Sequence, residues 1–311
     1  MIRSLIKNIS RNYAFAQFFQ KPDFGKYSIV MPGQVSPMRS VPEHIEKPDY
    51  YKTGEPKPAT RDIEIKNSKQ IQLLKDSCKL AANILEESGK ILKVGMTTDE
   101  LDNIIHQMIV KRGAYPSPLN YHHFPKSVCT SINNVACHGI PDDRKLQDGD
   151  IINVDITVFL NGYHGDCSKT YLVGNVDQKG RELVKATENC LKAGINVCKP
   201  GVDFCKIGEV IEKRAHEQGF GVVPAFCGHG IGSYFHGPPE IIHMENAYPY
   251  QMEPGMTFTI EPVLGQGSRD VELLEDGWTC ITTDGSRTAQ FEHTVLITDN
   301  GVEILTLPDE K

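Results

Sequence analysis

Residues 150–173 constrain the fold of this 311-residue chain more than any other segment. Residues 150–160 alternate between apolar and polar side chains, which is the period of a strand with one buried face. The dipeptide Asn161-Gly162 follows, and it is typical of two-residue hairpin loops. Residues 163–173 then run back as a second strand. The pattern therefore predicts a β-hairpin whose polar face carries Asn153, Asp155 and Thr157.

Two aspartates are the chemically informative residues of this hairpin. With a two-residue loop, Asp155 faces Ser168 and Thr157 faces Asp166. Asp155 and Asp166 are then diagonal neighbours on one face, about 7–8 Å apart at Cα. Two carboxylates in this arrangement repel each other unless a cation lies between them. The pair indicates either a metal site or a solvated face of the sheet.

Helical and strand patterns flank the hairpin on both sides. Apolar residues at helical spacing predict a helix over 68–90, and Thr97 with Glu100 forms a capping box that opens a second helix. The other expected elements are helices near 180–197 and 203–217, and strands near 256–264, 277–283, 288–298 and 302–306. This order predicts an α+β fold in which two similar halves, roughly 65–175 and 180–306, pack as one domain.

Composition excludes several classes of protein. The formal charge of −7 argues against general nucleic-acid binding, and no run approaches the roughly 18 apolar residues of a membrane span. The nine cysteines are scattered and form no C-x-x-C pair. We therefore expect reduced thiols and an intracellular compartment.

The N-terminal residues differ from the rest of the chain. Residues 1–22 contain four basic residues and no acid, and the first three basic residues share one face of a helix. This start indicates a mitochondrial transit peptide or, alternatively, a basic tail without a targeting role. Residues 23–60 are rich in Pro, Lys and Tyr and read as an extended arm. Residues 61–311 remain as the catalytic domain.

Further candidate residues lie in the second half of the chain. His229 stands in a glycine-rich segment, with His236 seven residues later. Glu261 ends an alternating strand, and Glu292 lies in the middle of another. Each of these residues alone has an ordinary structural explanation.

The candidate residues of the two halves form one set of metal ligands. Four carboxylates and one imidazole suit Mn²⁺, Fe²⁺, Co²⁺ or Zn²⁺. Five ligands are enough for two ions about 3.5–4 Å apart, which lower the pKa of a shared water and polarise a carbonyl. The set therefore points to hydrolysis.

Several motifs resemble the type I methionine aminopeptidases, and the likeness runs from about residue 65 to 306. Segments 114–119 and 124–129 are similar to the mitochondrial branch of that family. The resemblance implies the pita-bread fold, in which two pseudo-symmetric halves surround a central antiparallel sheet. The matching motifs lie at 135–141, 154–158, 164–166, 229–232, 260–262 and 290–293.

The resemblance also implies roles for individual residues. His138 would contact the substrate near its amide, His236 would contact the carbonyl oxygen, and Glu261 would be the general base. The metal ligands would be Asp155, Asp166, His229, Glu261 and Glu292. The methionine pocket would be lined by Tyr121, Phe124, Cys129, Phe235 and Trp278.

The implied activity is removal of the initiator methionine from nascent, newly synthesised or newly imported polypeptides, with a small second residue preferred. We expect a monomer in the mitochondrial matrix that acts on polypeptide N-termini, with no nucleic-acid or membrane partner. The chain departs from the family at Asn120 and His123, where glycines are usual. The larger residues would narrow the pocket mouth or stiffen its loop. His122 and His123 are expected at the rim rather than as ligands.

Two alternatives remain open at this point. An X-Pro aminopeptidase or dipeptidase shares the fold and the five ligands, but usually carries a sizeable extra N-terminal domain. A non-catalytic pita-bread binding protein would have lost metal ligands. Cys129 is the one cysteine with an expected role, whereas Cys78, Cys190 and His293 are expected to be structural.

Overall fold

The computed structural model describes residues 23–59 and 61–309, so the predicted transit peptide lies outside the described residues. The helices are α2 (Ser68–Ile91), α3 (Thr98–Lys111), α4 (Gln178–Asn196) and α5 (Cys205–Glu217), with a short 3₁₀ turn at Tyr121–His123. The strands of the first half are β1 (Tyr115–Pro116), β2 (Cys129–Ile132), β3 (Val135–Cys137), β4 (Ile151–Leu160) and β5 (Tyr163–Leu172). Those of the second half are β6 (Gly221–Val222), β7 (Cys227–Gly230), β8 (Gly237–Ile242), β9 (Thr257–Ile260), β10 (Val263–Gly265), β11 (Val271–Leu273), β12 (Cys280–Thr282), β13 (Thr288–Thr298) and β14 (Gly301–Ile304).

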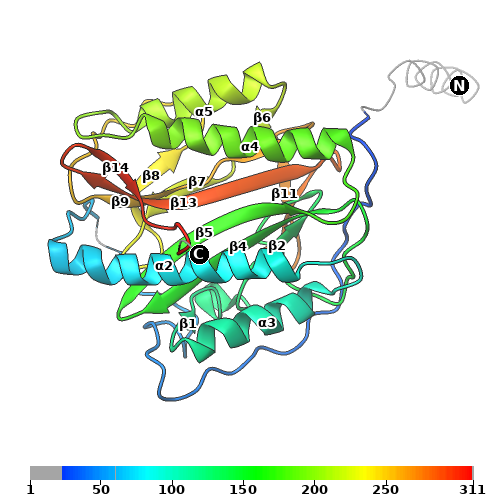
Figure 1. The fold of residues 1–311 in the computed structure, drawn as a ribbon, viewed down its shortest axis with the longest axis horizontal. Helices are drawn as coiled ribbons and strands as arrows, with labels where there is room; N and C mark the ends of the chain where they lie inside the picture. Colours follow the sequence, from blue (N-terminus) through cyan, green and yellow to red (C-terminus); the bar gives the residue numbers. More distant parts are fainter. Residues whose placement is uncertain (1–22, 60, 310–311) are drawn as a thin grey trace, which may run out of the picture.

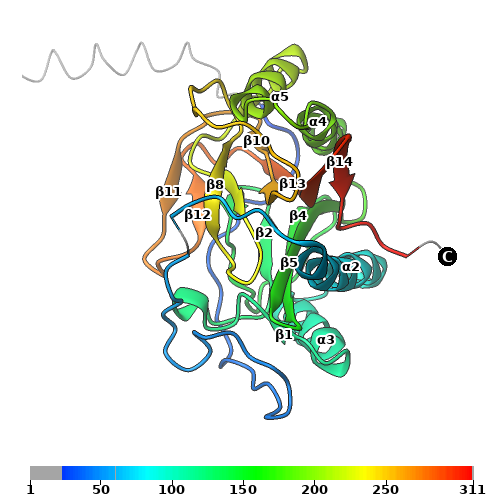
Figure 2. The ribbon, with the colours of Figure 1, turned by 90° about the vertical axis from the view of Figure 1, so that its left-hand side faces the viewer.

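An 11-stranded antiparallel sheet forms the centre of the molecule, with the main strand order β1-β4-β5-β13-β9-β7-β8. A three-stranded sheet, β11-β12-β3, lies beside it. Figures 1 and 2 show the helices gathered on one side of the large sheet, with α2 and α3 belonging to the first half and α4 and α5 to the second. The predicted α+β fold of two similar halves is confirmed.

The central hairpin has the predicted register. Asp155 pairs with Ser168, and Thr157 pairs with Asp166. Asn161 and Gly162 have φ angles of 52° and 81°. Both residues therefore occupy the left-handed region that the tight hairpin turn requires. The turn chemistry thus fixes which aspartates share a face.

Alternation along β13 separates the core from the polar face. Phe291, Val295 and Ile297 belong to an apolar cluster that includes residues of α4 and α5. Because successive side chains of a strand point to opposite faces, Gln290, Glu292 and Thr294 are on the face away from the helices. A second apolar cluster packs α2 and α3 against β2 and β4. The helices therefore cover one face of the sheet and leave the other for polar groups.

Helix caps and buried thiols agree with the sequence patterns. Thr97 and Glu100 form the predicted capping box at the start of α3. Cys78 and Cys190 have no exposed surface, as expected for core residues. All nine cysteines are free thiols.

Among the described residues, no helix has both the length and the apolar character needed to cross a bilayer.

The arm, residues 23–59, contains no helix or strand and packs against the body of the protein. In Figure 1 this blue segment passes down one side of the ribbon and loops beside β1 and α3. Val30 is buried in the α2–α3 cluster, and Ile45 and Tyr50 are buried against β1.

A buried arginine fastens the first described residues to the second half of the chain. Arg287 has no exposed surface, and its Nη2 donates to the Phe24 carbonyl at 2.7 Å and to Asp177 Oδ1 at 2.8 Å. The guanidinium carbon lies 4.5 Å from the centre of the Tyr27 ring. Its Nη1 has no hydrogen-bond partner among the described residues.

Candidate active site

A cavity of about 240 Å³ opens on the polar face of the sheet. It brings together every site residue predicted from the sequence. The metal-ligand candidates, the two histidines and the pocket residues all line it: Asp155, Asp166, His229, Glu261, Glu292, His138, His236, Tyr121, Phe124, Cys129, Phe235 and Trp278.

Five neighbouring strands each supply one of the predicted ligands. Asp155 lies on β4, Asp166 on β5 and Glu292 on β13. Glu261 directly follows β9, and His229 lies on β7. Because these strands are consecutive in the sheet, the five side chains converge although they are spread over 138 positions of sequence. Sheet topology, rather than local sequence, therefore assembles the cluster.

His229 and two of the carboxylates lie close enough together to hold one metal ion. Asp166, His229 and Glu292 offer ligand atoms that all lie within 4.8 Å of one another. His229 Nε2 is 3.8 Å from Asp166 Oδ2 and 3.6 Å from Glu261 Oε1. His229 Nδ1 contacts the Gly230 carbonyl at 3.2 Å. A proton on Nδ1 would leave the Nε2 lone pair free to bind a metal.

Two threonines orient the carboxylates through hydrogen bonds. Thr157 Oγ1 donates to Asp166 Oδ1 at 2.6 Å, and Thr259 Oγ1 donates to Glu261 Oε1 at 2.7 Å. Gln290 Nε2 donates to Glu261 Oε2 at 3.2 Å. These bonds hold the carboxylates in fixed positions before any ligand arrives.

The charge of the cluster calls for a cation. Burial raises the pKa of Asp155 to about 7 and that of Glu261 to about 8. Burial and the neighbouring carboxylates raise the pKa values of Asp166 and Glu292 well above their usual range. None of the described residues that line the cavity is a lysine or arginine. The oxygen-rich donor set and its unbalanced charge fit divalent metal ions.

The two predicted substrate histidines are neutral in this environment. Burial lowers the pKa of His138 to about 4, and its ring meets those of Phe226 and Trp278 edge-on at 5.9 and 5.7 Å. Although His236 is open to the cavity, desolvation and the neighbouring His229 hold its pKa well below the usual range. Both rings can therefore act as neutral hydrogen-bond donors near pH 7.

An aromatic wall completes the cavity. Phe124 and Trp278 meet edge-on with ring centres 5.2 Å apart, and Tyr121 lies 4.8 Å from Phe235. Cys129 is buried beside them. Apolar rings and a thiol suit a flexible thioether side chain.

The loop before Phe124 has the backbone conformation expected where the resemblance implies glycines. Asn120 has a φ of 62° and His123 a φ of 67°, in the left-handed region that glycine adopts most easily. Asn120 Nδ2 donates to the Tyr51 carbonyl at 3.0 Å. The side chains of His122 and His123 are 50% and 66% exposed, so they lie at the rim as predicted. Asn120 and His123, which are larger than glycine, both contact the arm through their side chains.

Some residues of the site were missed at the sequence level. Cys137 and Phe226 line the cavity, although Cys137 lies in the matching motif 135–141 directly before His138. Thr157 could have been found, because the hairpin register places it opposite Asp166. His164 stacks on Phe235 with ring centres 5.2 Å apart. It lies within a matching motif, but no residue pattern indicated its role.

Comparison with known proteins gives the family. The pattern of metallopeptidase family M24 matches residues 72–299. Methionine aminopeptidase 1D, mitochondrial, from Mus musculus is 54% identical over 294 residues, which cover 94% of this chain and 88% of the relative. The chain belongs to the methionine aminopeptidases of family M24. It is therefore a hydrolase, and membership of a metallopeptidase family implies the use of divalent metal.

Solved structures agree with this assignment. Methionine aminopeptidase from Rickettsia prowazekii is 42% identical with a TM-score of 0.78, covering 79% of this chain and all of that one. Prolidase from Pyrococcus furiosus is 22% identical with a TM-score of 0.64, covering 79% of this chain and 66% of the prolidase. The prolidase therefore shares the fold alone. The predicted pita-bread fold is confirmed, and the methionine aminopeptidase interpretation is favoured over the X-Pro alternative.

Proposed function

We propose that this methionine aminopeptidase removes the initiator methionine from nascent, newly synthesised or newly imported polypeptides in the mitochondrial matrix. The observation that carries the proposal is a carboxylate cluster beside an aromatic wall in one cavity of about 240 Å³. This volume is below the roughly 300–1,000 Å³ of pockets for drug-sized ligands, so it suits a single amino-acid residue. The acid-free sequence of residues 1–22 and the mitochondrial name of the mouse relative support the location.

We assign the metal ligands as Asp155, Asp166, His229, Glu261 and Glu292, holding two divalent ions of Co, Mn, Fe or Zn. When bound, such ions lower the pKa of a water and polarise the peptide carbonyl. The five ligands and the absence of a lysine or arginine among the described lining residues support this assignment.

Glu261 is the proposed general base of the reaction. Thr259 and Gln290 each hold one of its carboxylate oxygens, which fixes the direction in which it can accept a proton. A carboxylate held in this way can take the proton of the attacking water and pass it to the leaving amine.

The two histidines are proposed to bind the reacting peptide group. His236 Nδ1 lies 2.9 Å from the Tyr121 hydroxyl. If that hydroxyl donates, Nε2 carries the proton and can donate to the carbonyl oxygen as negative charge develops there. His138 is proposed to contact the scissile amide, and the rings of Phe226 and Trp278 fix its orientation.

The side chain of the first residue is proposed to bind Tyr121, Phe124, Cys129, Phe235 and Trp278. Because these residues present aromatic faces and a buried thiol, they favour methionine over a charged or branched residue. We also propose a preference for a small second residue, as the family resemblance implies.

The proposal is tested by metal analysis and peptide hydrolysis with the full chain. We expect stoichiometric divalent metal and faster cleavage of Met-Ala-Ser than of Ala-Pro-Ser. Faster cleavage of Ala-Pro-Ser would support the X-Pro alternative and contradict the proposal. A metal-loaded protein that hydrolyses neither peptide would indicate a binding protein instead. Light scattering at increasing concentration tests the proposed monomer.

A further inference from the structure

A second cavity adjoins the proposed active site. It has a volume of about 580 Å³ and shares Tyr121, Phe235 and His236 with the first cavity. His122, Phe159 and His164 form its floor, and its two walls come from parts of the chain that are far apart in sequence. One wall is the arm, at 47–50 and 56–59, and the other is the segment 233–236 after β7. We call this second cavity the arm groove.

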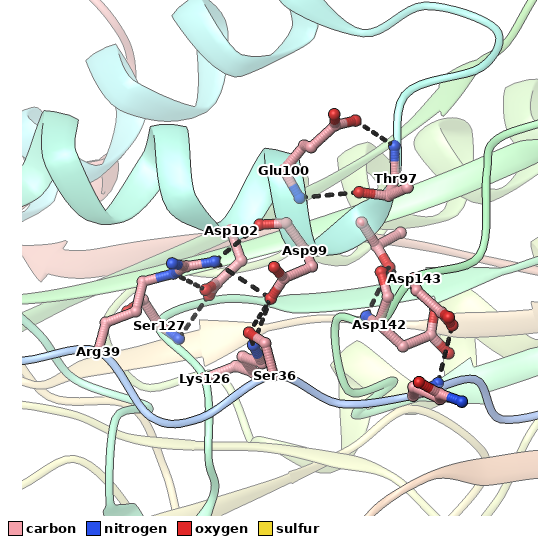
Figure 3. Close-up of polar contacts among 12 residues, drawn as sticks. Ser36, Arg39, Thr97, Asp99, Glu100, Asp102, Lys126, Ser127, Asp142 and Asp143 are labelled. Atoms are coloured by element: carbon pink, nitrogen blue, oxygen red, sulfur yellow. Dashed lines mark hydrogen bonds and ion pairs between the residues drawn. The ribbon is translucent and has the colours of Figure 1, made fainter.

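The arm is fixed to the body before it reaches the groove. Arg39 Nε lies 2.8 Å from Asp102 Oδ2, and its Nη2 lies 3.1 Å from Asp99 Oδ1. The Asp102 side chain is completely buried. Ser36 and the buried Lys126 also contact Asp99, as Figure 3 shows. Five polar side chains, two from the arm and three from the body, therefore hold this part of the arm at the start of α3.

The arm is fixed again where it forms the groove. Tyr50 is 2% exposed, and its hydroxyl donates to the Ser117 carbonyl at 2.6 Å. Its ring meets that of Tyr121 edge-on at 5.0 Å. Asp49 Oδ2 accepts from the Lys57 backbone N–H at 3.2 Å, which closes the arm into a loop. The wall is thus a built surface that directly supports Tyr121.

We infer that the arm groove binds the residues that follow the initiator methionine in a polypeptide substrate. This inference rests on the proposed function, because His236 at the junction is assigned to the reacting carbonyl. The arm groove begins at His236, so a chain whose first residue fills the smaller cavity has a continuous path from there into the groove. Lys47, Lys57 and Asp49 give the lining charges of both signs. The groove therefore selects for substrate length rather than for a particular charge.

The occupant that we assign is an extended polypeptide segment. A groove lined by rings, hydroxyls and charges of both signs matches a backbone with alternating donors and acceptors. A free dipeptide ends before the groove and gains nothing from it. The arm is then part of the substrate-binding surface, although it lies outside the segment 72–299 that matches the family pattern.

The test compares substrate lengths in the metal-loaded full chain. The substrates are Met-Ala-amide and an octapeptide that begins Met-Ala-Ser, and the variant Lys57→Trp places bulk in the groove. We expect a higher kcat/KM for the octapeptide in the parent protein. In Lys57→Trp, we expect kcat/KM for the octapeptide to fall about tenfold through KM, equivalent to roughly 1.4 kcal/mol of binding. The loss for Met-Ala-amide should be clearly smaller.

The matched control is Lys52→Trp, which changes an exposed lysine of the same arm outside both cavities. This variant should keep the length preference of the parent protein. Equal kcat/KM values for the two substrates in the parent protein, or equal losses for both in Lys57→Trp, would overturn the groove assignment. Failure of the metal-loaded parent protein to cleave either substrate would instead contradict the proposed function. Thermal unfolding of both variants checks that they are folded.

Discussion

The substitution Glu261→Gln should stabilise the metal-free protein and weaken the metal-loaded one. Glu261 is buried in a cluster of four carboxylates, and its pKa is raised to about 8 from an ordinary value of 4.5. A group whose pKa is raised on folding loses its favourable contribution as pH rises from the unfolded pKa towards the folded one. The neutral amide of glutamine avoids this loss, but it is a poorer metal ligand.

The magnitude follows from the two pKa values. A tenfold change in an ionisation constant is worth about 1.36 kcal/mol, so placing Glu261 in the metal-free cluster costs about 4 kcal/mol at pH 8. At pH 5.5 the carboxyl is largely protonated in the folded state, and the same comparison gives about 1 kcal/mol. At roughly 2 °C for each kcal/mol in a chain of this size, the variant should unfold about 8 °C higher at pH 8.

The assay is thermal unfolding of both proteins after chelator treatment, at pH 5.5 and pH 8, with and without added Mn²⁺. Comparison of the two proteins at each pH cancels the contributions of the buried histidines, which both proteins contain. The advantage of the variant should grow with pH when metal is absent and reverse when metal is present. A metal-free variant that is less stable than the parent protein at pH 8 would refute the electrostatic argument.

Three other substitutions test separate parts of the site and the arm. Asp166→Ala should remove bound metal and turnover together, measured by elemental analysis and Met-Ala-Ser cleavage; wild-type activity would contradict its assignment as a ligand. His138→Ala should keep the metal and lower turnover, so loss of metal would exclude a role in substrate contact alone. Arg39→Ala leaves the buried Asp102 without its arginine partner and should lower the free energy of unfolding by about 3 kcal/mol in urea titrations. An unchanged urea midpoint would show that the arm is not fixed at α3.

Much of the fold followed from local chemistry in the sequence. The alternating strand and Asn161-Gly162 determine the hairpin register, because a two-residue loop admits only one pairing of Asp155 with Ser168. The long strand β13 also has its predicted bounds, since eleven residues of alternation leave little freedom. Signals carried by neighbouring residues were therefore sufficient for these elements.

The convergence of the site depends on contacts that no local pattern encodes. The strand of His229 has four residues, and its position beside β9 depends on long-range pairing. The positive φ angles at Asn120 and His123 could be suspected only from the family's glycines. The arm has neither a helical nor a strand period, so its packing against Tyr121 was not predictable. The arm also forms one wall of the arm groove, and only the three-dimensional structure shows this.

The buried guanidinium of Arg287 makes the first described residues part of the folded structure, which bears on where the proposed transit peptide can end. Cleavage after Phe24 would remove a carbonyl that accepts from Nη2, while Nη1 already has no hydrogen-bond partner among the described residues. An unmet buried donor costs about 1–3 kcal/mol, and more when it is charged. Cleavage beyond Tyr27 would also remove the ring that lies against the guanidinium. A chain that keeps Phe24 is therefore expected to be more stable than one cut after it, because the carbonyl of Phe24 remains bound to Arg287.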